Sequence, residues 1–557
     1  MDAFGIREKL IAGYRSFTEG FVDIQDPRIK DAVVELGDKG RQWPDPWLSL
    51  NPSFSSGGRV DELVRRGLLH PDCDAIFRPK KDGGDRGSAP ITLHKHQRDA
   101  IEIAAKKASY VLTTGTGSGK SLAYIVPIVD RVLREGTGKG VKAIIVYPMN
   151  ALANSQMEEL SKFLDNGFGG KPPVTFARYT GQERGETREN ILKNPPDILL
   201  TNYVMLEYVL TRPEERQSLI RAASGLQFLV LDELHTYRGR QGADVAMLVR
   251  RLRDACNAQS TLQCIGTSAT MSSGGTVARQ QRDVAEVASR IFGTVVSPEH
   301  VVTETLVQAT TNQHRSDQDL KAAVRERGDA EYSSPTLDGG YTLMTSDPLA
   351  SWIEDTFGLT TEQESGKIIR RQPQTVTHAA EELAKQTGET ASSCATAIRA
   401  TLLAGSRAKH TETNRPLFAF RLHQFISKAG SLYATAESED TRLIETDFQL
   451  TVGEAEKRLY PLAFCRECGQ EYLMARLTET GGESRFIARH ELKMQDTGGP
   501  DNGQDGYLYI STEQEWPEQA IEAGRIPASW LNEAVSGNRV IESKRKRIPS
   551  RYRVQPD

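Results

Sequence analysis

Long apolar runs are absent from this chain of 557 residues. No stretch approaches the roughly eighteen consecutive apolar residues that a membrane-spanning helix requires. The segment that follows Met1 also lacks the apolar core of a signal peptide. The sequence therefore predicts a cytoplasmic protein with no membrane partner.

Cysteine is scarce as well, with 6 residues spread along the chain. Cys256 and Cys264 lie in or beside apolar stretches, which is typical of buried thiols. This pattern excludes a disulfide framework and indicates a reducing compartment.

The chain has no excess of charge of one sign, because 70 Lys and Arg residues stand against 74 Asp and Glu residues. Both signs are mixed along most of the chain, so no global basic field attracts a polyanion. Any contact with nucleic acid would have to be local. The basic run 544–547 could touch a phosphate backbone, or it could be a solvated surface segment.

A glycine-rich turn is the most informative segment that is present. It directly follows the apolar run 110–112 and directly precedes the run 122–126, so a strand, a turn and a helix start are expected. In this geometry backbone N–H groups and the positive end of a helix dipole converge on one point, which suits a polyphosphate. Lys120 would reach the β- and γ-phosphates, and the Ser121 hydroxyl would bind Mg²⁺. The expected phosphate-binding residues are Thr114, which stands where the usual motif has glycine, Gly115, Thr116, Gly117, Ser118, Gly119, Lys120 and Ser121.

A second motif follows the apolar run 228–231 and reads Asp232, Glu233, Leu234, His235. Ligands of open α/β sheets bind where such strands end. Asp232 is expected to hold Mg²⁺, directly or through water, and Glu233 to orient and deprotonate the water that attacks the γ-phosphate. An isolated Asp-Glu pair could simply end a strand in solvated acids, but the glycine-rich turn upstream favours the catalytic interpretation.

Short apolar runs alternate with helical periods from residue 91 to about residue 300. This rhythm predicts a parallel sheet covered on both faces, the P-loop α/β architecture. The expected strands are 110–112, 142–147, 174–179, 197–201, 228–232 and 264–267.

Together these motifs resemble motifs I and II of the superfamily II DEAD/DEAH-box helicases. The block 232–242 is most similar to the YprA/MrfA-type helicases and to the related large helicases of Druantia and DISARM phage-defence systems. The resemblance implies a RecA-like domain, ATP and Mg²⁺ as cofactors, and helicase or translocase activity. It is compatible with DNA repair and with antiphage defence. Further blocks that resemble family motifs are 93–97, 147–156, 179–181, 201–203, 205–207 and 268–270.

The resemblance also implies individual roles. Gln97 would read the adenine edge, and His235, Ser268 and Thr270 would couple hydrolysis to strand movement. Polar groups at one sheet edge can hold phosphates and sugars without reading sequence, although each could be an ordinary turn or cap residue. The expected partner is single-stranded or duplex nucleic acid, with DNA favoured by the resemblance. The candidate nucleic-acid contacts are Asn150, Asn154, Arg178, Thr180, Gly181, Thr201 and Asn202.

Cys465 and Cys468 have the spacing at which two thiolates can share one zinc ion. One such pair is half a site, so His423, His490 or Cys394, or residues beyond this chain, would have to complete it. The alternative is a cysteine pair in a tight turn.

The chain is too long for one core. The sequence predicts a helical N-terminal module and linker (1–90), the RecA-like ATP-binding domain (91–305), a mostly helical accessory domain (306–457) and a Cys-x-x-Cys segment (458–557). Nothing after residue 300 resembles the second RecA-like domain that carries the arginine finger of the family, so this domain is expected in a longer protein or a partner chain.

Two functions follow from these predictions. The first is an ATP-dependent nucleic-acid motor. The second is an ATP-binding regulatory or scaffold subunit without its own ATPase activity. A P-loop kinase or GTPase is disfavoured, because the chain has no guanine-reading Asn-Lys-x-Asp motif and the motifs at 232–235 and 268–270 would have no role there.

Overall fold

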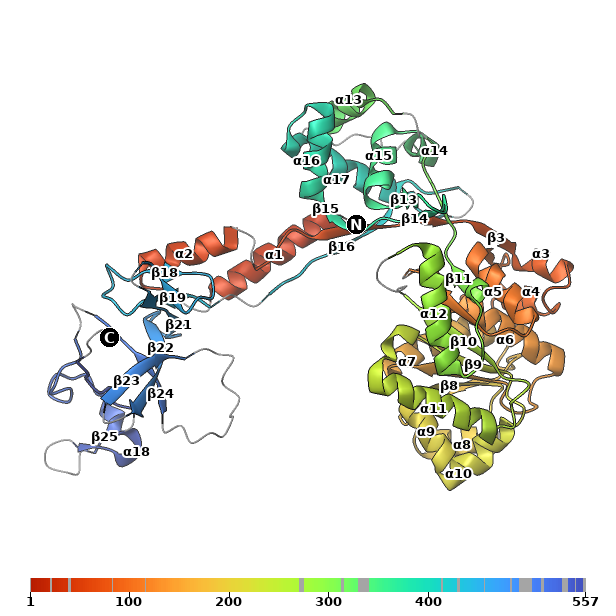
Figure 1. Ribbon diagram of the computed structural model, residues 1–557, viewed down its shortest axis with the longest axis horizontal. Coiled ribbons are helices and arrows are strands. Elements are labelled where there is room, and N and C mark those ends of the chain that lie inside the picture. The colour runs from red at the N-terminus through yellow and green to blue at the C-terminus, as the bar shows by residue number, and fades with distance from the viewer. Residues whose placement is uncertain are drawn as a thin grey trace. The chain divides into compact units, whose positions relative to one another are not determined.

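The computed structural model of the chain divides into two compact units (Figure 1). One unit contains residues 48–421, and the other contains residues 1–47 together with residues 422–557. The structure describes residues 2–20, 23–38, 42–82, 84–115, 117–269, 275–311, 315–328, 340–411, 414–427, 431–454, 456–480, 483–489, 503–511, 515–532, 539–545 and 547–553.

A seven-stranded parallel sheet forms the centre of the larger unit, with the strand order β11-β5-β10-β9-β6-β8-β7. The predicted α/β fold with a parallel RecA-like sheet is confirmed, and each of the six expected runs contains a strand. The strand β11, next to β5, was not expected from the sequence. The strands are β5 (Tyr110–Thr113), β6 (Ala143–Tyr147), β7 (Phe176–Arg178), β8 (Ile198–Asn202), β9 (Phe228–Leu231), β10 (Gln263–Ser268) and β11 (Val301–Thr303).

Apolar side chains of the sheet alternate between two hydrophobic clusters, because successive side chains of a strand point to opposite faces. Leu112 and Ile145 pack with α5, α6 and α7 on one face. Val111 and Ile144 pack with α9, α11 and α12 on the other face. The helices are α5 (Lys95–Ala105), α6 (Leu122–Glu135), α7 (Asn150–Leu164), α8 (Gly185–Lys193), α9 (Tyr203–Thr211), α10 (Pro213–Glu215), α11 (Gly239–Ala255) and α12 (Val277–Phe292).

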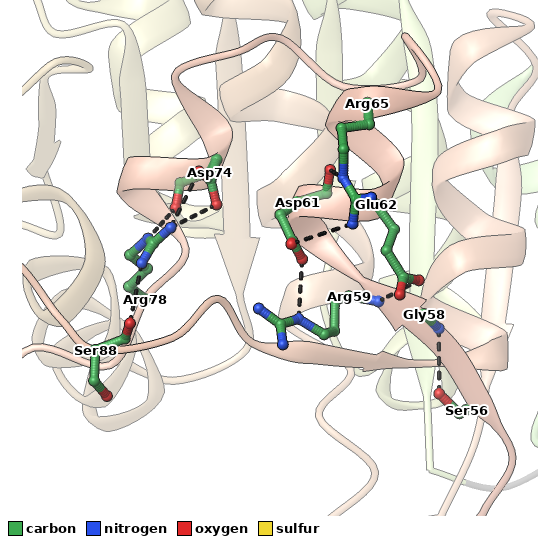
Figure 2. A network of polar contacts seen from close by, with 9 residues as sticks. All are labelled: Ser56, Gly58, Arg59, Asp61, Glu62, Arg65, Asp74, Arg78 and Ser88. Carbon is green, nitrogen blue, oxygen red and sulfur yellow. Dashed lines mark hydrogen bonds and ion pairs between the residues drawn. The ribbon is translucent and has the colours of Figure 1, made fainter.

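The segment before the sheet packs onto it through buried apolar residues such as Leu63 and Ile76. A network of polar contacts lies beside them, in which Arg78 donates to both oxygens of Asp74 at 2.9 and 3.1 Å (Figure 2). Exposed ion pairs of this kind add little to stability, so burial holds the segment in place. Its elements are β1 (Trp47–Asn51), β2 (Ser53–Phe54), β3 (Ser56–Arg59), α3 (Val60–Arg65), α4 (Cys73–Ile76) and β4 (Thr92–His94).

Helices predominate after the sheet, where α13, α15 and α16 pack against α17. The buried Arg327 donates to the carboxylate of Asp347, whose side chain also caps the start of α15. The elements are β12 (Leu306–Val307), α13 (Asp317–Arg327), α14 (Tyr341–Thr345), α15 (Pro348–Phe357), β13 (Leu359–Thr361), β14 (Ile368–Arg370), β15 (Gln374–Thr375), α16 (Val376–Thr387), α17 (Ala391–Arg407) and β16 (Ala419–His423).

The smaller unit joins two helices near the N-terminus to antiparallel strands far along the chain. Ile29 and Leu36 of α2 pack with Leu432, Tyr460 and Leu473. This grouping differs from the consecutive segments expected from the sequence, because the α2 helix buries its apolar face on strands beyond residue 431. The elements are α1 (Ala3–Glu19), α2 (Pro27–Asp38), β17 (Tyr433–Ala434), β18 (Ile444–Glu445), β19 (Thr451–Val452), β20 (Lys457–Arg458), β21 (Tyr460–Phe464), β22 (Glu471–Thr480), β23 (Glu483–Ala488), β24 (Gln504–Leu508), β25 (Leu531–Asn532), β26 (Arg539–Val540) and α18 (Glu542–Arg545).

No helix in the described part of the chain has the length and apolar character needed to cross a membrane.

Candidate functional site

The glycine-rich turn and the acidic pair follow two strands, β5 and β9, which are separated in the sheet by β10. The end of β10 connects the two. The backbone N–H of Thr114 donates to the carbonyl of Ser268 at 3.3 Å. The Thr267 hydroxyl donates to the Asp232 carboxylate and accepts the backbone N–H of Glu233 at 3.1 Å. Motifs that are far apart in sequence thus form one site at the carboxyl edge of the sheet.

Lys120 faces the acidic pair from the turn. Its Nζ lies 3.9 Å from Oε1 of Glu233, and its side chain is 12% exposed. Burial lowers the pKa of Lys120, and the negative charges of Glu233 and Asp232 partly oppose this effect. Lys120 therefore lies close to two carboxylates in a site that is partly shielded from water.

Asp232 is half-buried in the same site, and burial raises the pKa of its carboxyl, although the hydrogen bond from Thr267 opposes the shift. A buried carboxylate of this kind is stabilised in its ionised form by a cation. Carboxylate and hydroxyl oxygens are the ligands that Mg²⁺ prefers. The donor set of Ser121 and Asp232 therefore fits a magnesium ion bound with nucleotide phosphates.

Two glycines of the turn have left-handed backbone conformations, with φ of +83° at Gly117 and +71° at Gly119. A Cβ on Gly119 would also lie 2.6 Å from Nε2 of Gln97. The turn is closed by a hydrogen bond of 2.6 Å between the hydroxyls of Thr114 and Ser118. Both the backbone conformation and the close approach explain why glycine is needed there. Thr116 lies outside the described residues.

Gln97 braces the turn through both ends of its side-chain amide. Its Oε1 accepts the backbone N–H of His94 at 2.7 Å, and its Nε2 donates to the carbonyl of Gly119 at 2.8 Å. The adenine contact expected of Gln97 stays a prediction. Sequence reasoning missed His96, whose Nε2 lies 2.9 Å from the Ser118 carbonyl. In the sequence, only the position of His96 next to Gln97 indicated that it could contact the turn.

His235 and Ser268 come together as expected from their motifs. The Nδ1 atom of His235 lies 3.2 Å from the Ser268 hydroxyl and 3.3 Å from Oε2 of Glu233. Glu233 has a left-handed backbone with φ of +51°, which is uncommon for a residue with a side chain and is concentrated at functional sites. Thr270, the third predicted coupling residue, lies outside the described residues.

The predicted nucleic-acid residues meet at the ends of β6, β7 and β8. Asn202 donates to Asn150 at 2.7 Å and to the carbonyl of Thr180 at 3.3 Å, and it also caps α9. Thr201 instead donates to the carbonyl of Tyr179 at 2.7 Å and is buried, so its hydroxyl serves the fold.

Arg178 and Asn154 lie side by side at the same edge, where the guanidinium donates to the Asn154 amide oxygen. The guanidinium also pairs with Glu183 at 2.5 Å. A paired arginine contributes less positive charge to a phosphate contact than a free one would.

A groove of about 610 Å³ opens beside these polar groups. Asn150, Gly181 and Asn202 line it together with Met149, Tyr208 and Arg212, which sequence reasoning missed. Met149 is 60% exposed and Tyr208 is 44% exposed. The Arg212 guanidinium lies 4.2 Å from the centre of the Tyr208 ring. Tyr208 lies in α9 and Arg212 directly follows the end of this helix, so no helical spacing in the sequence singled out the pair.

The cysteine pair lies in the tight turn between β21 and β22. The backbone N–H of Cys465 donates to the Gln470 carbonyl at 2.9 Å, and hydrogen bonds from the backbone of Cys468 and Glu467 lower the pKa of the Cys465 thiol. No group of three or more His, Cys, Asp or Glu side chains suited to a metal ion occurs among the described residues. The expected structural zinc is therefore not supported. Cys394 is buried in α17, and His490 lies outside the described residues.

Residues 94–276 match the family of DEAD/DEAH box helicases. The Druantia protein DruE of Escherichia coli (strain UMEA 4076-1) is 24% identical over 361 residues, which are 44% of this chain and 19% of that protein. The uncharacterized ATP-dependent helicase YprA of Bacillus subtilis (strain 168) is 32% identical over 164 residues, which are 29% of this chain and 21% of that protein. Each match therefore spans about a fifth of the relative's length.

A solved structure of the DUF1998 helicase MrfA bound to DNA is also similar. It has a TM-score of 0.36 and 20% sequence identity, and the match covers 53% of this chain and 37% of that chain.

Proposed function

Because residues 94–276 of this chain form a DEAD/DEAH box helicase domain, we propose that the chain supplies the ATP-binding motor domain of a nucleic-acid helicase or translocase. One observation carries the proposal. The end of β10 joins the glycine-rich turn to Asp232 and Glu233 through the hydrogen bonds of Thr114, Thr267 and Ser268.

Each residue of the site has a proposed task in ATP hydrolysis. The backbone N–H groups of the turn and the Lys120 ammonium hold the phosphates, while Ser121 and Asp232 hold Mg²⁺. When bound there, the metal would neutralise charge that develops on the phosphates. Glu233 orients the attacking water and accepts its proton. His235, which contacts both Glu233 and Ser268, would couple the hydrolysis step to the edge of the sheet that binds the strand.

The nucleic-acid strand is proposed to follow the groove beside Asn150, Gly181 and Asn202. Amides and backbone N–H groups there can hold phosphates and sugars, and the exposed rings and apolar side chains offer a stacking surface for bases. DNA is the proposed strand, as the resemblance to YprA/MrfA-type helicases implies.

A second RecA-like domain, in a longer protein or in a partner chain, is proposed to complete the ATP site. It would supply the arginine finger, a group that contributes on the order of 10³–10⁵ to the rate in related enzymes. The chain described here would then bind ATP more readily than it hydrolyses it.

The test is ATP binding and turnover by the chain, with and without single-stranded DNA, compared with Lys120→Ala. Loss of the ammonium should weaken ATP binding at least about tenfold, because a charge-assisted contact to the phosphates is lost. Unchanged affinity in this variant contradicts the proposal. ATP binding without turnover, even with DNA, favours the regulatory or scaffold subunit.

The strand path is tested by Tyr208→Ala. Stacking of a base on an aromatic ring contributes about 1–3 kcal/mol, so the affinity for single-stranded DNA should fall roughly 5- to 140-fold. Fluorescence anisotropy with a labelled oligonucleotide measures the change. Val287→Ala, which removes an apolar side chain 50% exposed on α12, is the matched control and should bind as the wild type does. Equal affinity of the two variants would place the strand elsewhere.

A further inference from the structure

An acidic side chain of the protein itself occupies a backbone N–H of the glycine-rich turn. The N–H of Gly115 donates to Oε2 of Glu304 at 3.1 Å, and Glu304 directly follows β11, the neighbour of β5. Backbone N–H groups of such turns are the groups that bind phosphate oxygens. A carboxylate thus lies on a group suited to a phosphate anion.

Arg370 also holds this carboxylate. It ends β14, the second strand of the hairpin β13–β14. Its Nε and Nη2 donate to the two oxygens of Glu304 at 2.5 and 2.9 Å. The bidentate geometry of a guanidinium suits carboxylates and phosphates equally. The arginine that grips the carboxylate could therefore grip a phosphate in its place.

Gly115 makes room for this arginine. A Cβ at this position would lie 2.5 Å from the guanidinium carbon of Arg370. Gly117 and Gly119 have positive φ values, whereas Gly115 does not. Gly115 therefore has no side chain for reasons of space and not of backbone conformation, because the guanidinium of Arg370 occupies the volume that a side chain would fill.

The pair also acts on Lys120. Burial lowers the pKa of the lysine, the charge of Glu304 opposes this shift, and the charge of Arg370 adds to it. The side chains of Arg370 and Glu304 are 27% and 15% exposed, so water screens their charges only in part. Both groups therefore lie within electrostatic reach of the phosphate-binding lysine.

We propose that Arg370 is a phosphate-binding residue that the accessory hairpin supplies within the same chain, and that Glu304 is an internal anion which ATP must displace. The inference rests on the proposed ATP site. When the phosphates arrive, they take the N–H of Gly115 and the guanidinium of Arg370, and like-charge repulsion drives the carboxylate away. Because β13 directly follows α15, binding of ATP would also move or fix the accessory helices.

The proposal predicts opposite effects for the two partners of one ion pair. Glu304→Gln removes the competing negative charge and should tighten ATP binding about tenfold. Arg370→Gln removes the phosphate contact and should weaken ATP binding about tenfold, with a smaller effect on ADP. These factors correspond to one hydrogen bond with a charged group. Titration of the full chain with fluorescent ATP and ADP analogues measures both, and thermal melting of each variant reports its stability.

Arg371→Gln is the matched control, since its guanidinium donates to the carbonyl of Asp355 at 2.8 Å and belongs to the same hairpin. It should bind ATP as the wild type does. If both Glu304→Gln and Arg370→Gln weaken ATP binding together with stability, or if neither changes it, the inference is overturned and the pair is a structural brace. If the wild type binds no ATP, or Lys120→Ala binds it equally well, the proposed function itself has failed.

Discussion

Replacing Glu233 by glutamine is expected to lower the ATPase rate by about 10²–10⁴-fold while ATP binding stays near the wild-type level. The range is the usual contribution of a general base. The amide has the shape of the carboxylate but cannot accept the proton of the attacking water. The backbone N–H of residue 233 keeps its bond to Thr267, so the local fold is retained.

The measurement is kcat at saturating ATP and single-stranded DNA, or with the second motor domain added if the chain alone is slow, together with the ATP affinity. Glu286→Gln, in an exposed ion pair with Arg290 on α12, is the control and should keep the wild-type rate. If kcat of Glu233→Gln were close to that of this control, Glu233 would not be the general base of the reaction.

Replacing Arg442 by methionine is expected to destabilise the smaller unit by about 3–5 kcal/mol, the usual cost of breaking a buried ion pair. Arg442 is 3% exposed, and its guanidinium donates to Asp26 and to Glu471, at 2.5 Å in the second case. Without it, two carboxylates would lie close together and no cation would compensate them. Denaturant unfolding, followed by a probe within residues 431–489, measures the loss.

Arg485→Met is the matched control, because its ion pair with Glu483 is exposed and such pairs contribute at most about 1 kcal/mol. A loss in Arg442→Met no larger than in this control would mean that apolar packing alone holds the unit together.

The same ion pair predicts a dependence on pH. Burial raises the pKa of Asp26, but the hydrogen bonds from Arg442 and the backbone N–H of Arg28 outweigh it, so the pKa in the folded state is lowered. A lowered carboxyl pKa stabilises the fold above the pKa of the unfolded chain, and this stabilisation is lost as the pH falls through the folded value. In Arg442→Met, the free energy of unfolding should therefore change less than in the wild type as the pH falls through the acid range.

The sequence predicted the parts of the structure that depend on local pattern. Buried parallel strands are continuous apolar runs, so β5 to β10 could be recognised, and the turn after β5 has its own glycine signature. The short strand β11 carries no comparable run. The contact between Glu304 and Arg370 joins residues 66 positions apart through an ordinary ion pair. No local pattern distinguishes such a pair from the many exposed ones.

The candidate site was predictable to a similar degree. The contacts among Lys120, Glu233 and the end of β10 follow from where parallel strands end. The groove beside Tyr208 depends instead on exposure, which periodicity on a helix does not give. The grouping of residues 1–47 with residues 422–557 depends on half-buried short strands, whose partners are set by tertiary packing.

The division of the smaller unit between both ends of the chain bears on synthesis at the ribosome. Helices α1 and α2 emerge before the sheet of the larger unit, yet Asp26 meets Arg442 only after a further 416 residues have been made. Domains fold largely in the order in which they leave the ribosome. Residues 48–421 can therefore complete their sheet before the strands that pack against α2 have been made. A chain arrested before residue 432 would carry a complete parallel sheet and an α2 helix with its apolar face uncovered, which is the kind of surface that chaperones bind.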